Sequence, residues 1–344
     1  MATHANTLMA KINSDSDEKT QTVLITGGAG YIGSWVTQRF LGLGYKVVVF
    51  DKLLFGSRPV LSFLGHPNYK FIQGDIRNPA EIDAAMKGVD HVAHLAAIVG
   101  EAACNKDPDA AKSINMDGTA QVARAAKKNN IRRMICFSTC SSYGVQDTSQ
   151  MATEETPTNP VSLYAESKIF AEKIFFDEIG SNNDMACAVF RPSTVHGASP
   201  RMRFDLMVNH FVKDAIYKKK LGISGTEMWR PLMWVGDAGK AIALAFNADT
   251  TAIRNQVFNL GGVEGNYRKR EIGEIIKQKY MPELQLDFGF SDPDVRSYRV
   301  DFTKINKHLG FTLSKDLDQA IGDLFQLFKY EIITDPANPV YHNA

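Results

Sequence analysis

The sequence predicts an α/β protein with a doubly wound parallel sheet and a smaller C-terminal lobe interwoven with the main domain. Short apolar strands alternate with helices from residue 22 to residue 138, a pattern typical of parallel sheets. A glycine-rich turn follows the first strand, and small or polar residues follow several later strands. Together these observations indicate a Rossmann-type domain that binds a dinucleotide.

The glycine turn lies in Thr22–Gly33, which reads TVLITGGAGYIG. The β-branched run predicts a buried strand, and the glycines at 27, 28, 30 and 33 predict a tight turn that opens a helix. Because glycine has no Cβ, a diphosphate can approach this backbone and bind the free N–H groups of the helix. An ordinary strand-to-helix turn is the alternative interpretation.

The second strand, Lys46–Phe50, ends at Asp51, 18 residues after Gly33. A ribose-binding acid is expected at about this place. Its carboxylate would accept bonds from both ribose hydroxyls and repel a 2′-phosphate, which favours NAD over NADP. Lys52 and Arg58 are nearby cations that could compensate for this repulsion.

Asp75 follows the third strand, Lys70–Ile72, in the sequence Gly74-Asp75-Ile76. At the carboxyl end of a strand it can accept from the adenine amino group, or it can instead cap the next helix. The fourth strand runs into small residues that leave room for the cofactor. The elements predicted next are a strand at 90–97, a helix at 113–129 and a strand at 133–138.

Hydroxyl groups crowd the end of the fifth strand, in the sequence STCSSYG from residue 138 to residue 144. A helix at 163–173 then carries Tyr164 and Lys168, whose spacing of four places both on one helical face. An ammonium beside the phenol would lower the tyrosine pKa and let it exchange a proton with a sugar hydroxyl. Taken alone, this spacing is common on protein surfaces.

The remaining chain is predicted to build the smaller lobe and to return once to the main domain. Asp237 caps a returning helix, a strand follows at 256–260, and amphipathic helices are expected at 269–278, 301–309 and 317–328. We therefore assign residues 1–21 to a disordered leader, 22–195 and 231–262 to the dinucleotide-binding domain, 196–230 and 263–330 to the substrate-binding lobe, and 331–344 to a loose tail.

Composition excludes several classes of function. The 344 residues are 44% hydrophobic with a formal net charge of +1, and no basic run exceeds three residues, which argues against nucleic acid as a partner. The four cysteines show no metal-binding or disulfide spacing. No stretch approaches the roughly 18 apolar residues of a membrane span. A soluble, cytoplasmic protein without a metal is expected.

In combination, these motifs resemble the extended short-chain dehydrogenase/reductases, and within them the nucleotide-sugar epimerase/dehydratase group. The resemblance extends from Thr22 to about Leu327. It is carried by the segments TGGAGYIG, GDIRN, HLAA, FSTCSSYG, YAESK, FRPSTVHG, RPLMWVGDAGKA and NLGG.

The resemblance implies roles for particular residues. Tyr164 would be the acid/base, Lys168 would bind the nicotinamide ribose, and Thr139 would bond the reacting hydroxyl. The substrate's diphosphate would lie near Asn209, Arg230 and Arg296, although each arginine alone would more often be a surface charge. The implied NAD contacts are Gly27, Gly30, Tyr31, Ile32, Gly33, Asp51, Lys52, Asp75, Ile76, Leu95, Ala96, Ala97, Asn115, Ser138, Tyr164 and Lys168.

The reaction depends on the residues beside Thr139. Dehydratases of this family carry an Asp-Glu pair where this chain has Cys140 and Ser141, so dehydration is disfavoured. A 4-epimerase needs no such pair, but either residue could act as a second acid/base for epimerisation at C3 or C5. Packing is the alternative role for Cys140. His196 replaces the family's usual aromatic residue. It would either pack in the interior or face the nicotinamide pocket, where it would bind the substrate and titrate near pH 6.5.

Three functions follow as hypotheses. The first is an NAD-dependent epimerase of a nucleotide-diphosphate sugar, assembled as a homodimer through the helices at 113–129 and 163–173, as is usual in the family. The second is a reductase of a nucleotide 4-keto-sugar that consumes NAD(P)H, against which Asp51 argues. The third is a non-catalytic nucleotide sensor, but a sensor has no need of the proton-transfer groups Thr139, Tyr164 and Lys168.

Overall fold

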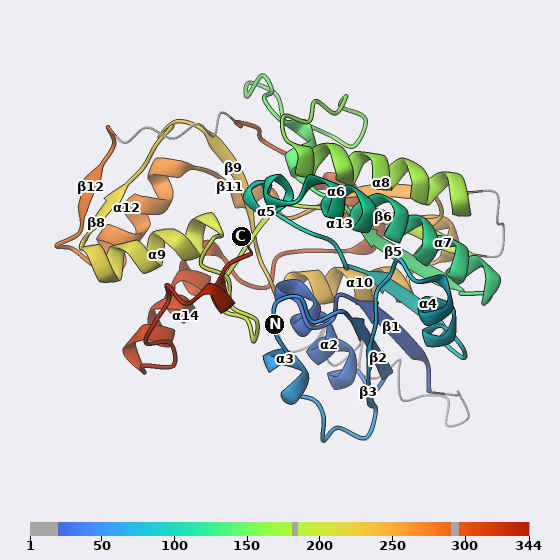
Figure 1. Ribbon diagram of the computed structural model, residues 1–344. Coiled ribbons are helices and arrows are strands. Elements are labelled where there is room, and N and C mark those ends of the chain that lie inside the picture. The colour runs from blue at the N-terminus through green and yellow to red at the C-terminus, as the bar shows by residue number, and fades with distance from the viewer. Residues whose placement is uncertain (1–19, 181–184, 290–295, 344) are drawn as a thin grey trace.

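Seven parallel strands form the central sheet of this computed structural model, in the order β10-β6-β5-β4-β1-β2-β3 (Figure 1). The structure describes residues 20–180, 185–289 and 296–343. The predicted doubly wound parallel sheet is confirmed. Its strands are β1 (Thr22–Thr26), β2 (Lys46–Asp51), β3 (Tyr69–Gln73), β4 (His91–His94), β5 (Arg133–Phe137), β6 (Ala186–Pro192) and β10 (Gln256–Leu260).

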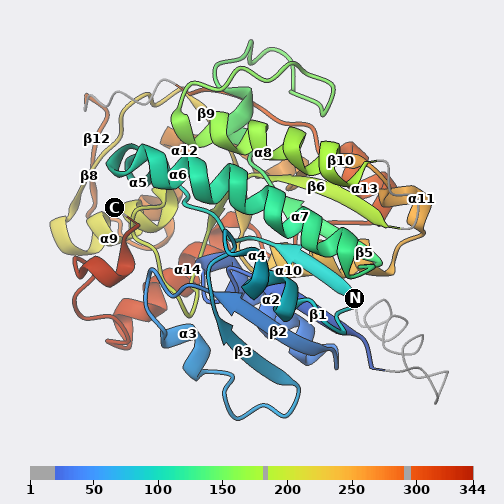
Figure 2. The same ribbon diagram turned by 45° about the vertical axis from the view of Figure 1, so that its right-hand side comes forward.

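Helices cover both faces of this sheet (Figure 2). On one face, α2 and α10 pack together and bury Val36 and Phe40 among the β-branched residues of the strands. On the other face, α4, α7 and α8 bury Val122 and Phe175. The helices of this domain are α2 (Tyr31–Gly42), α3 (Arg58–Leu61), α4 (Pro79–Ala85), α5 (Glu101–Lys106), α6 (Pro108–Lys112), α7 (Thr119–Lys128), α8 (Leu163–Ile179), α10 (Asp237–Asn247), α11 (Thr250–Ile253) and α13 (Thr303–Leu309).

A smaller lobe has its own core, which includes Phe211, Ile272 and Leu324. Two small sheets, ordered β11-β9-β7 and β12-β8, support it. Because β10 joins the central sheet between segments of this lobe, the chain passes back and forth between the two. The elements here are β7 (Thr194–His196), α9 (Met207–Lys218), β8 (Lys220–Gly222), β9 (Trp229–Trp234), β11 (Asn266–Arg268), α12 (Lys269–Lys279), β12 (Gln285–Asp287) and α14 (Leu317–Lys329).

Two segments differ from the sequence expectation. The helix expected at 113–129 begins as a π-helix, Ser113–Gly118, and continues as α7. The segment after residue 331, expected to be loose, instead contacts both lobes; Phe204 donates its backbone N–H to the Tyr341 carbonyl at 2.9 Å. The predicted leader falls almost wholly outside the described residues. Among the residues described, no helix is long and apolar enough to cross a membrane.

Candidate active site

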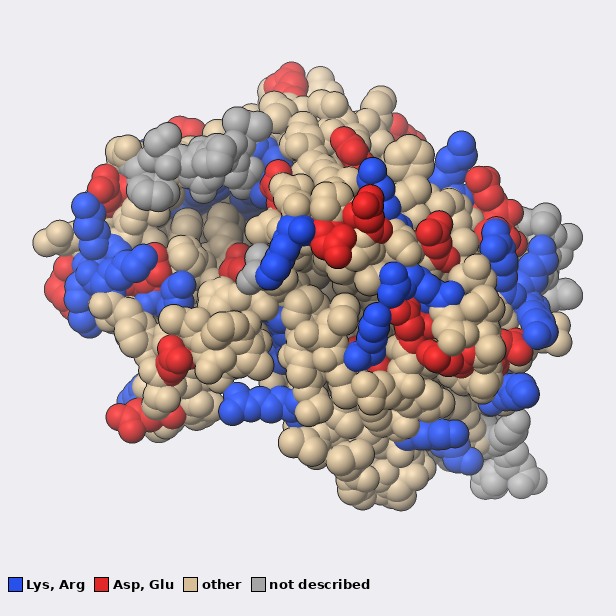
Figure 3. Space-filling view, viewed as in Figure 1, with Lys and Arg blue, Asp and Glu red and all other residues tan. Residues whose placement is uncertain are grey.

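A cavity of about 610 Å³ lies between the two lobes, at the carboxyl edge of the central sheet. The space-filling view shows the surface hollowed there, with acidic and basic side chains interspersed over the visible face (Figure 3). Open α/β sheets bind ligands at this edge.

The glycine turn forms the floor of one end of the cavity. Gly27 has a φ of +75°, and a Cβ there would lie 2.7 Å from the Ala96 backbone nitrogen. A Cβ on Gly33 would lie 2.1 Å from the Gly27 carbonyl oxygen. Helix α2 begins directly after Gly30, and no side chain caps its first N–H groups. The turn therefore fits a diphosphate bound against bare backbone at a helix N-terminus.

Asp51 ends β2 at the wall of the same cavity. One carboxylate oxygen accepts the Ala29 N–H at 3.0 Å, and the other accepts the Leu53 N–H at 2.8 Å. Burial raises the pKa of Asp51, and these two backbone bonds oppose the rise. Each oxygen keeps a lone pair that a ribose hydroxyl can use.

Asp75 and Lys52 form an ion pair at 2.9 Å on the cavity wall. Arg77 also binds Asp75, with an N–O distance of 2.6 Å, and these bonds hold the Asp75 pKa well below its usual range. Helix α4 is capped by Asn78, whose side chain accepts an N–H from the first turn. The helix-cap interpretation of Asp75 is therefore wrong.

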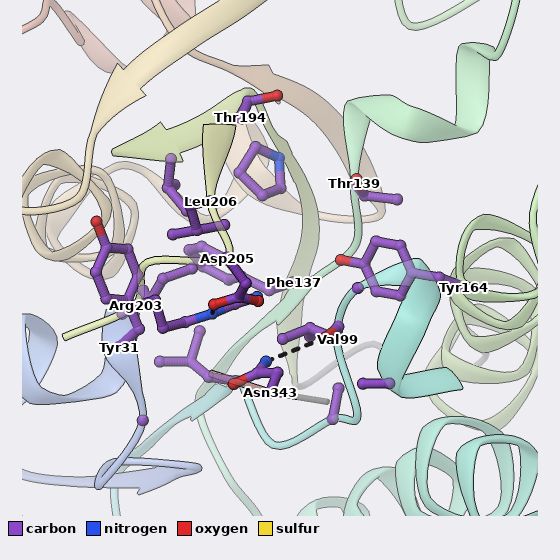
Figure 4. A pocket seen from close by; sticks show the side chains of 18 of the residues that line it. Tyr31, Val99, Phe137, Thr139, Tyr164, Thr194, Arg203, Asp205, Leu206 and Asn343 are labelled. Atoms are coloured by element: carbon purple, nitrogen blue, oxygen red, sulfur yellow. Dashed lines mark hydrogen bonds and ion pairs between the residues drawn. The ribbon is translucent and has the colours of Figure 1, made fainter. Parts of the chain in front are cut away.

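Thr139, Tyr164 and Lys168 come together on the opposite wall. Tyr164 and Lys168 lie one turn apart in α8, which begins after the capping residue Ser162. Thr139 follows β5 and accepts the Ser141 N–H at 3.0 Å. Figure 4 shows the Tyr164 hydroxyl directed into the pocket on the side where Thr139 lies. The three residues are placed as proton transfer to a bound hydroxyl requires.

Burial raises the pKa of Tyr164 to about 12, and a hydrogen bond with Thr139 opposes the rise. The expectation that Lys168 lowers this pKa is wrong for the protein alone, because desolvation of the phenol outweighs every other effect. Burial also disfavours the charged form of Lys168 and lowers the pKa of its ammonium group. Burial therefore favours the protonated form of the Tyr164 phenol.

Cys140 and Ser141 point in different directions. The Cys140 side chain is fully buried away from the cavity, and its Sγ donates to the Arg191 carbonyl at 3.0 Å. Its interpretation as an acid/base is therefore wrong, since the thiol cannot reach a cavity ligand. Ser141 lines the cavity, with its hydroxyl 3.4 Å from the Tyr298 hydroxyl.

Asn115 does not line the cavity, although it was expected to contact the cofactor. It is fully buried in the π-helix, and its amide binds both backbone groups of Ile98, at 2.8 and 3.0 Å. The extra residue in the π turn gives Asn115 this position. Its role is to fix the loop after β4, whose residues do line the cavity.

Asn209 is also a structural residue. Its oxygen accepts the Gly197 N–H at 2.9 Å, and its nitrogen donates to the Tyr31 hydroxyl at 3.1 Å and the Arg203 carbonyl at 2.8 Å. The side chain is fully buried outside the cavity lining. The prediction that Asn209 approaches the substrate is therefore wrong.

His196 lies in β7 with 2% of its surface exposed, outside the main cavity. It lines a separate small pocket with Trp234 and Tyr267. Burial lowers its pKa to about 3, so the ring does not titrate near pH 6.5. Its packing role is supported, and its assignment to substrate binding is wrong.

Arg230 and Arg296 both line the cavity, on the side of the smaller lobe. The Arg230 guanidinium donates to the Trp229 carbonyl at 2.9 Å and to the Arg296 carbonyl, and lies 5.8 Å from the centre of the Tyr298 ring. One Arg296 nitrogen is 3.9 Å from a Glu101 oxygen. Two guanidinium groups in the lining of one cavity suit an anionic ligand.

The structure also brings residues to the cavity that the sequence reasoning missed. Four residues upstream of Asn209, Asp205 lines the cavity and pairs with Arg203 at 2.5 Å (Figure 4). In SPRMRFD, every second residue from Arg201 to Asp205 is charged, and this pattern could have indicated that the segment carries cavity residues. Others, such as Lys269 and Asn343, had no local signal. The cavity lining includes every predicted cofactor residue except Asn115.

The chain is similar to proteins that are named as enzymes of UDP-sugars. UDP-glucuronic acid decarboxylase 4 of Arabidopsis thaliana is 26% identical, over 92% of this chain and 70% of that protein. The probable UDP-arabinose 4-epimerase 1 of Oryza sativa subsp. japonica is 29% identical, over 84% of this chain and 75% of that protein.

The crystal structure of UDP-glucuronic acid 4-epimerase from Bacillus cereus, in complex with UDP-glucuronic acid and NAD, has the same fold. The two structures superpose with a TM-score of 0.81 and are 24% identical in sequence, over 90% of this chain and 99% of that chain. The family model of the NAD dependent epimerase/dehydratase family matches residues 23–261, which is most of the chain. This protein belongs to the NAD dependent epimerase/dehydratase family.

Proposed function

We propose that this protein is an NAD-dependent epimerase that inverts C4 of a nucleotide-diphosphate sugar through a transient keto-sugar. The observation that carries the proposal is the meeting of Thr139, Tyr164 and Lys168 in one cavity with the glycine turn, where Ser141 is the neighbouring reactive side chain. No carboxylate occupies the positions of Cys140 and Ser141, so a group suited to expelling a hydroxyl is absent there. The 4-epimerases among the relatives support this choice.

In the proposed reaction, Thr139 would bond the C4 hydroxyl and Tyr164 would take its proton as the phenolate, a form that the positive charges of Lys168 and of an oxidised nicotinamide would favour against burial. Bound NAD would supply a reversible acceptor for the C4 hydride. The keto-sugar then rotates in the cavity, the hydride returns to the other face of C4, and Tyr164 gives the proton back to the oxygen, so no reductant is consumed. Lys168 would hold the nicotinamide ribose, while Arg230 and Arg296 would bind the diphosphate.

Two contacts support NAD over NADP as the cofactor. Asp51 lines the cavity at the end of β2, where its carboxylate would repel a 2′-phosphate, and the nearby cations Lys52 and Arg58 each have a hydrogen-bond partner already. Lys52 binds Asp75 at 2.9 Å, and Arg58 donates to the Tyr341 hydroxyl at 2.9 Å. A reductase of the NADPH-consuming kind therefore has less support than an epimerase.

The proposal is tested by incubating the purified protein with a panel of UDP- and dTDP-linked hexoses, pentoses and uronic acids in ²H₂O, followed by ¹H NMR. We expect a 4-epimer pair at equilibrium, without added NAD and without deuterium in the sugar ring. Deuterium at C3 or C5 would instead assign acid/base chemistry to Ser141. A decarboxylated pentose, a 4-keto-6-deoxy sugar or dependence on NADPH would each replace the proposal by another reaction.

We also propose a homodimer that packs through α7 and α8. Phe170 on α8 is 54% exposed, an unusually open position for an aromatic residue on a helix that otherwise covers the sheet. Light scattering measures the mass directly. A Phe170→Asp variant should shift the mass toward the monomer, and an unchanged mass would place the interface elsewhere.

A further inference from the structure

Residues 338–343, which we call the strap, bridge the two lobes beside the cavity, whose lining includes Asn343. On the main domain, the Arg58 guanidinium donates to the Tyr341 hydroxyl at 2.9 Å, and the Asn343 amide donates to the Val99 carbonyl at 3.1 Å (Figure 4). Arg58 comes after β2 and Val99 comes after β4. Both therefore stand at the sheet edge that carries Asp51 and the glycine turn.

The strap is bonded to the smaller lobe as well. The Phe204 N–H donates to the Tyr341 carbonyl at 2.9 Å, and the two rings meet edge to face with centroids 5.8 Å apart. Arg201 donates to the His342 carbonyl at 3.2 Å, while its guanidinium lies 4.6 Å from the centre of the Phe55 ring on the main domain. The strap thus joins both walls of the cavity.

The strap has a fixed conformation of its own. Asn338 caps a short 3₁₀ helix, Pro339–Tyr341, by accepting the Val340 N–H at 3.1 Å. The His342 ring lies 3.1 Å from the Pro336 carbonyl. A segment that is already ordered loses less entropy on closing over a ligand than a flexible one would.

Asn343 offers a free contact to whatever fills the cavity. Asn343 lines the cavity. Its side-chain oxygen, Oδ1, is buried without a hydrogen-bond partner among the residues that the structure describes. A buried acceptor without a partner carries a free-energy cost that a ligand donor can remove. Because Phe55 and Arg58 lie four and seven residues after Asp51, the strap contacts the cavity at its dinucleotide end.

We propose that the strap closes the dinucleotide end of the cavity and slows exchange of the cofactor. The inference rests on the proposed function in one respect, since an epimerase that recycles its hydride gains from keeping NAD between turnovers. On this proposal, the dinucleotide leaves quickly only when the strap has broken its own hydrogen bonds to one of the two lobes. Most differences in affinity of this kind are expressed in the dissociation rate.

The test measures dissociation of a fluorescent etheno-adenine analogue of NAD, chased with excess NAD in a stopped-flow instrument. Two variants open the strap: a chain ending at residue 337, and the full-length Asn343→Ala. Asn129→Ala is the matched control, because that amide also joins two elements, binding Asp83 at 2.8 Å on a partly exposed region of the main domain. Thermal melts check that each variant is folded.

We expect dissociation about tenfold faster or more in the shortened chain and about threefold faster in Asn343→Ala, from the loss of several hydrogen bonds or of one. Asn129→Ala should match the parent protein. Equal dissociation rates in the parent and Asn343→Ala would overturn the proposal even if the shortened chain fails to fold. The readout needs no turnover, so a protein that retains NAD without epimerising any sugar would overturn only the proposed function.

Discussion

Replacing Tyr164 by phenylalanine should remove catalysis while leaving the fold and cofactor binding intact. The substitution deletes one hydroxyl, whose hydrogen bond is to Thr139, and keeps the ring in place. Thr139 still accepts the Ser141 N–H at 3.0 Å, so we expect a stability cost of only about 1 kcal/mol. Loss of a positioned acid/base costs about 10²- to 10⁴-fold in rate, or about 3–5 kcal/mol of barrier.

A second buried tyrosine provides the matched control. Tyr143 is fully buried outside the cavity, and its hydroxyl donates to Asn259 at 2.7 Å and accepts from Arg191 at 3.1 Å. Tyr143→Phe removes one hydrogen bond from Asn259 and one from Arg191. We therefore expect the unfolding free energy to fall by about 1–3 kcal/mol, with turnover nearly unchanged. Epimer formation is followed by NMR, and stability by denaturant titration. Turnover of Tyr164→Phe within tenfold of the parent protein would refute the assignment.

Three further predictions follow from the cavity and the core. Asp51→Asn should weaken NAD binding about 10- to 100-fold and reduce the preference for NAD over NADP, because charged hydrogen bonds to the ribose are lost. Calorimetric titration with both dinucleotides checks this, and an unchanged affinity for NAD would contradict it. Cys140→Ala should leave the epimerisation rate within about twofold while lowering the unfolding free energy by about 1 kcal/mol, since the thiol only packs and donates to a carbonyl; a large rate loss would restore it as a catalytic group. Burial lowers the pKa values of His94 and His196 from 6.5 to about 3, so both stay neutral in the folded protein while the unfolded chain takes up protons below pH 6.5. The unfolding free energy should therefore fall as the pH drops from 6.5 toward 3, by up to about 1.4 kcal/mol per pH unit for each histidine, and denaturant titrations at pH 7 and pH 5 should show a shallower fall in His196→Phe.

The sheet was predictable because its signals are local. Each of the strands β1 to β5 is a short apolar run that can be recognised within a few positions, and a parallel sheet then follows from the alternation of strands and helices. Asp51 and the pair Tyr164 and Lys168 were placed by spacing alone, because a strand end and a helical face fix where such side chains lie. The structure puts all three on the cavity wall.

Side-chain direction within irregular segments was not predictable in the same way. The π turn at Asn115 rotates its amide onto Ile98, and no sequence period signals that turn. Asn209 lies only four residues beyond the cavity residue Asp205. Its side-chain amide nevertheless hydrogen-bonds to Gly197, Tyr31 and Arg203 and not to the cavity. Spacing cannot decide such cases, because the outcome depends on contacts made by distant parts of the chain.

The pair Cys140 and Ser141 shows how a local turn decides the chemistry. Thr139 ends the extended backbone of β5, and the next four residues form a 3₁₀ helix, so consecutive side chains leave in different directions. Cys140 turns inward to the Arg191 carbonyl, and Ser141 turns outward to the cavity. Only the second position can therefore touch a substrate. A dehydratase needs an acid at such a position to expel a hydroxyl, and this chain presents an alcohol there, which leaves transfer of the hydride and of the Tyr164 proton as the chemistry best matched to the site.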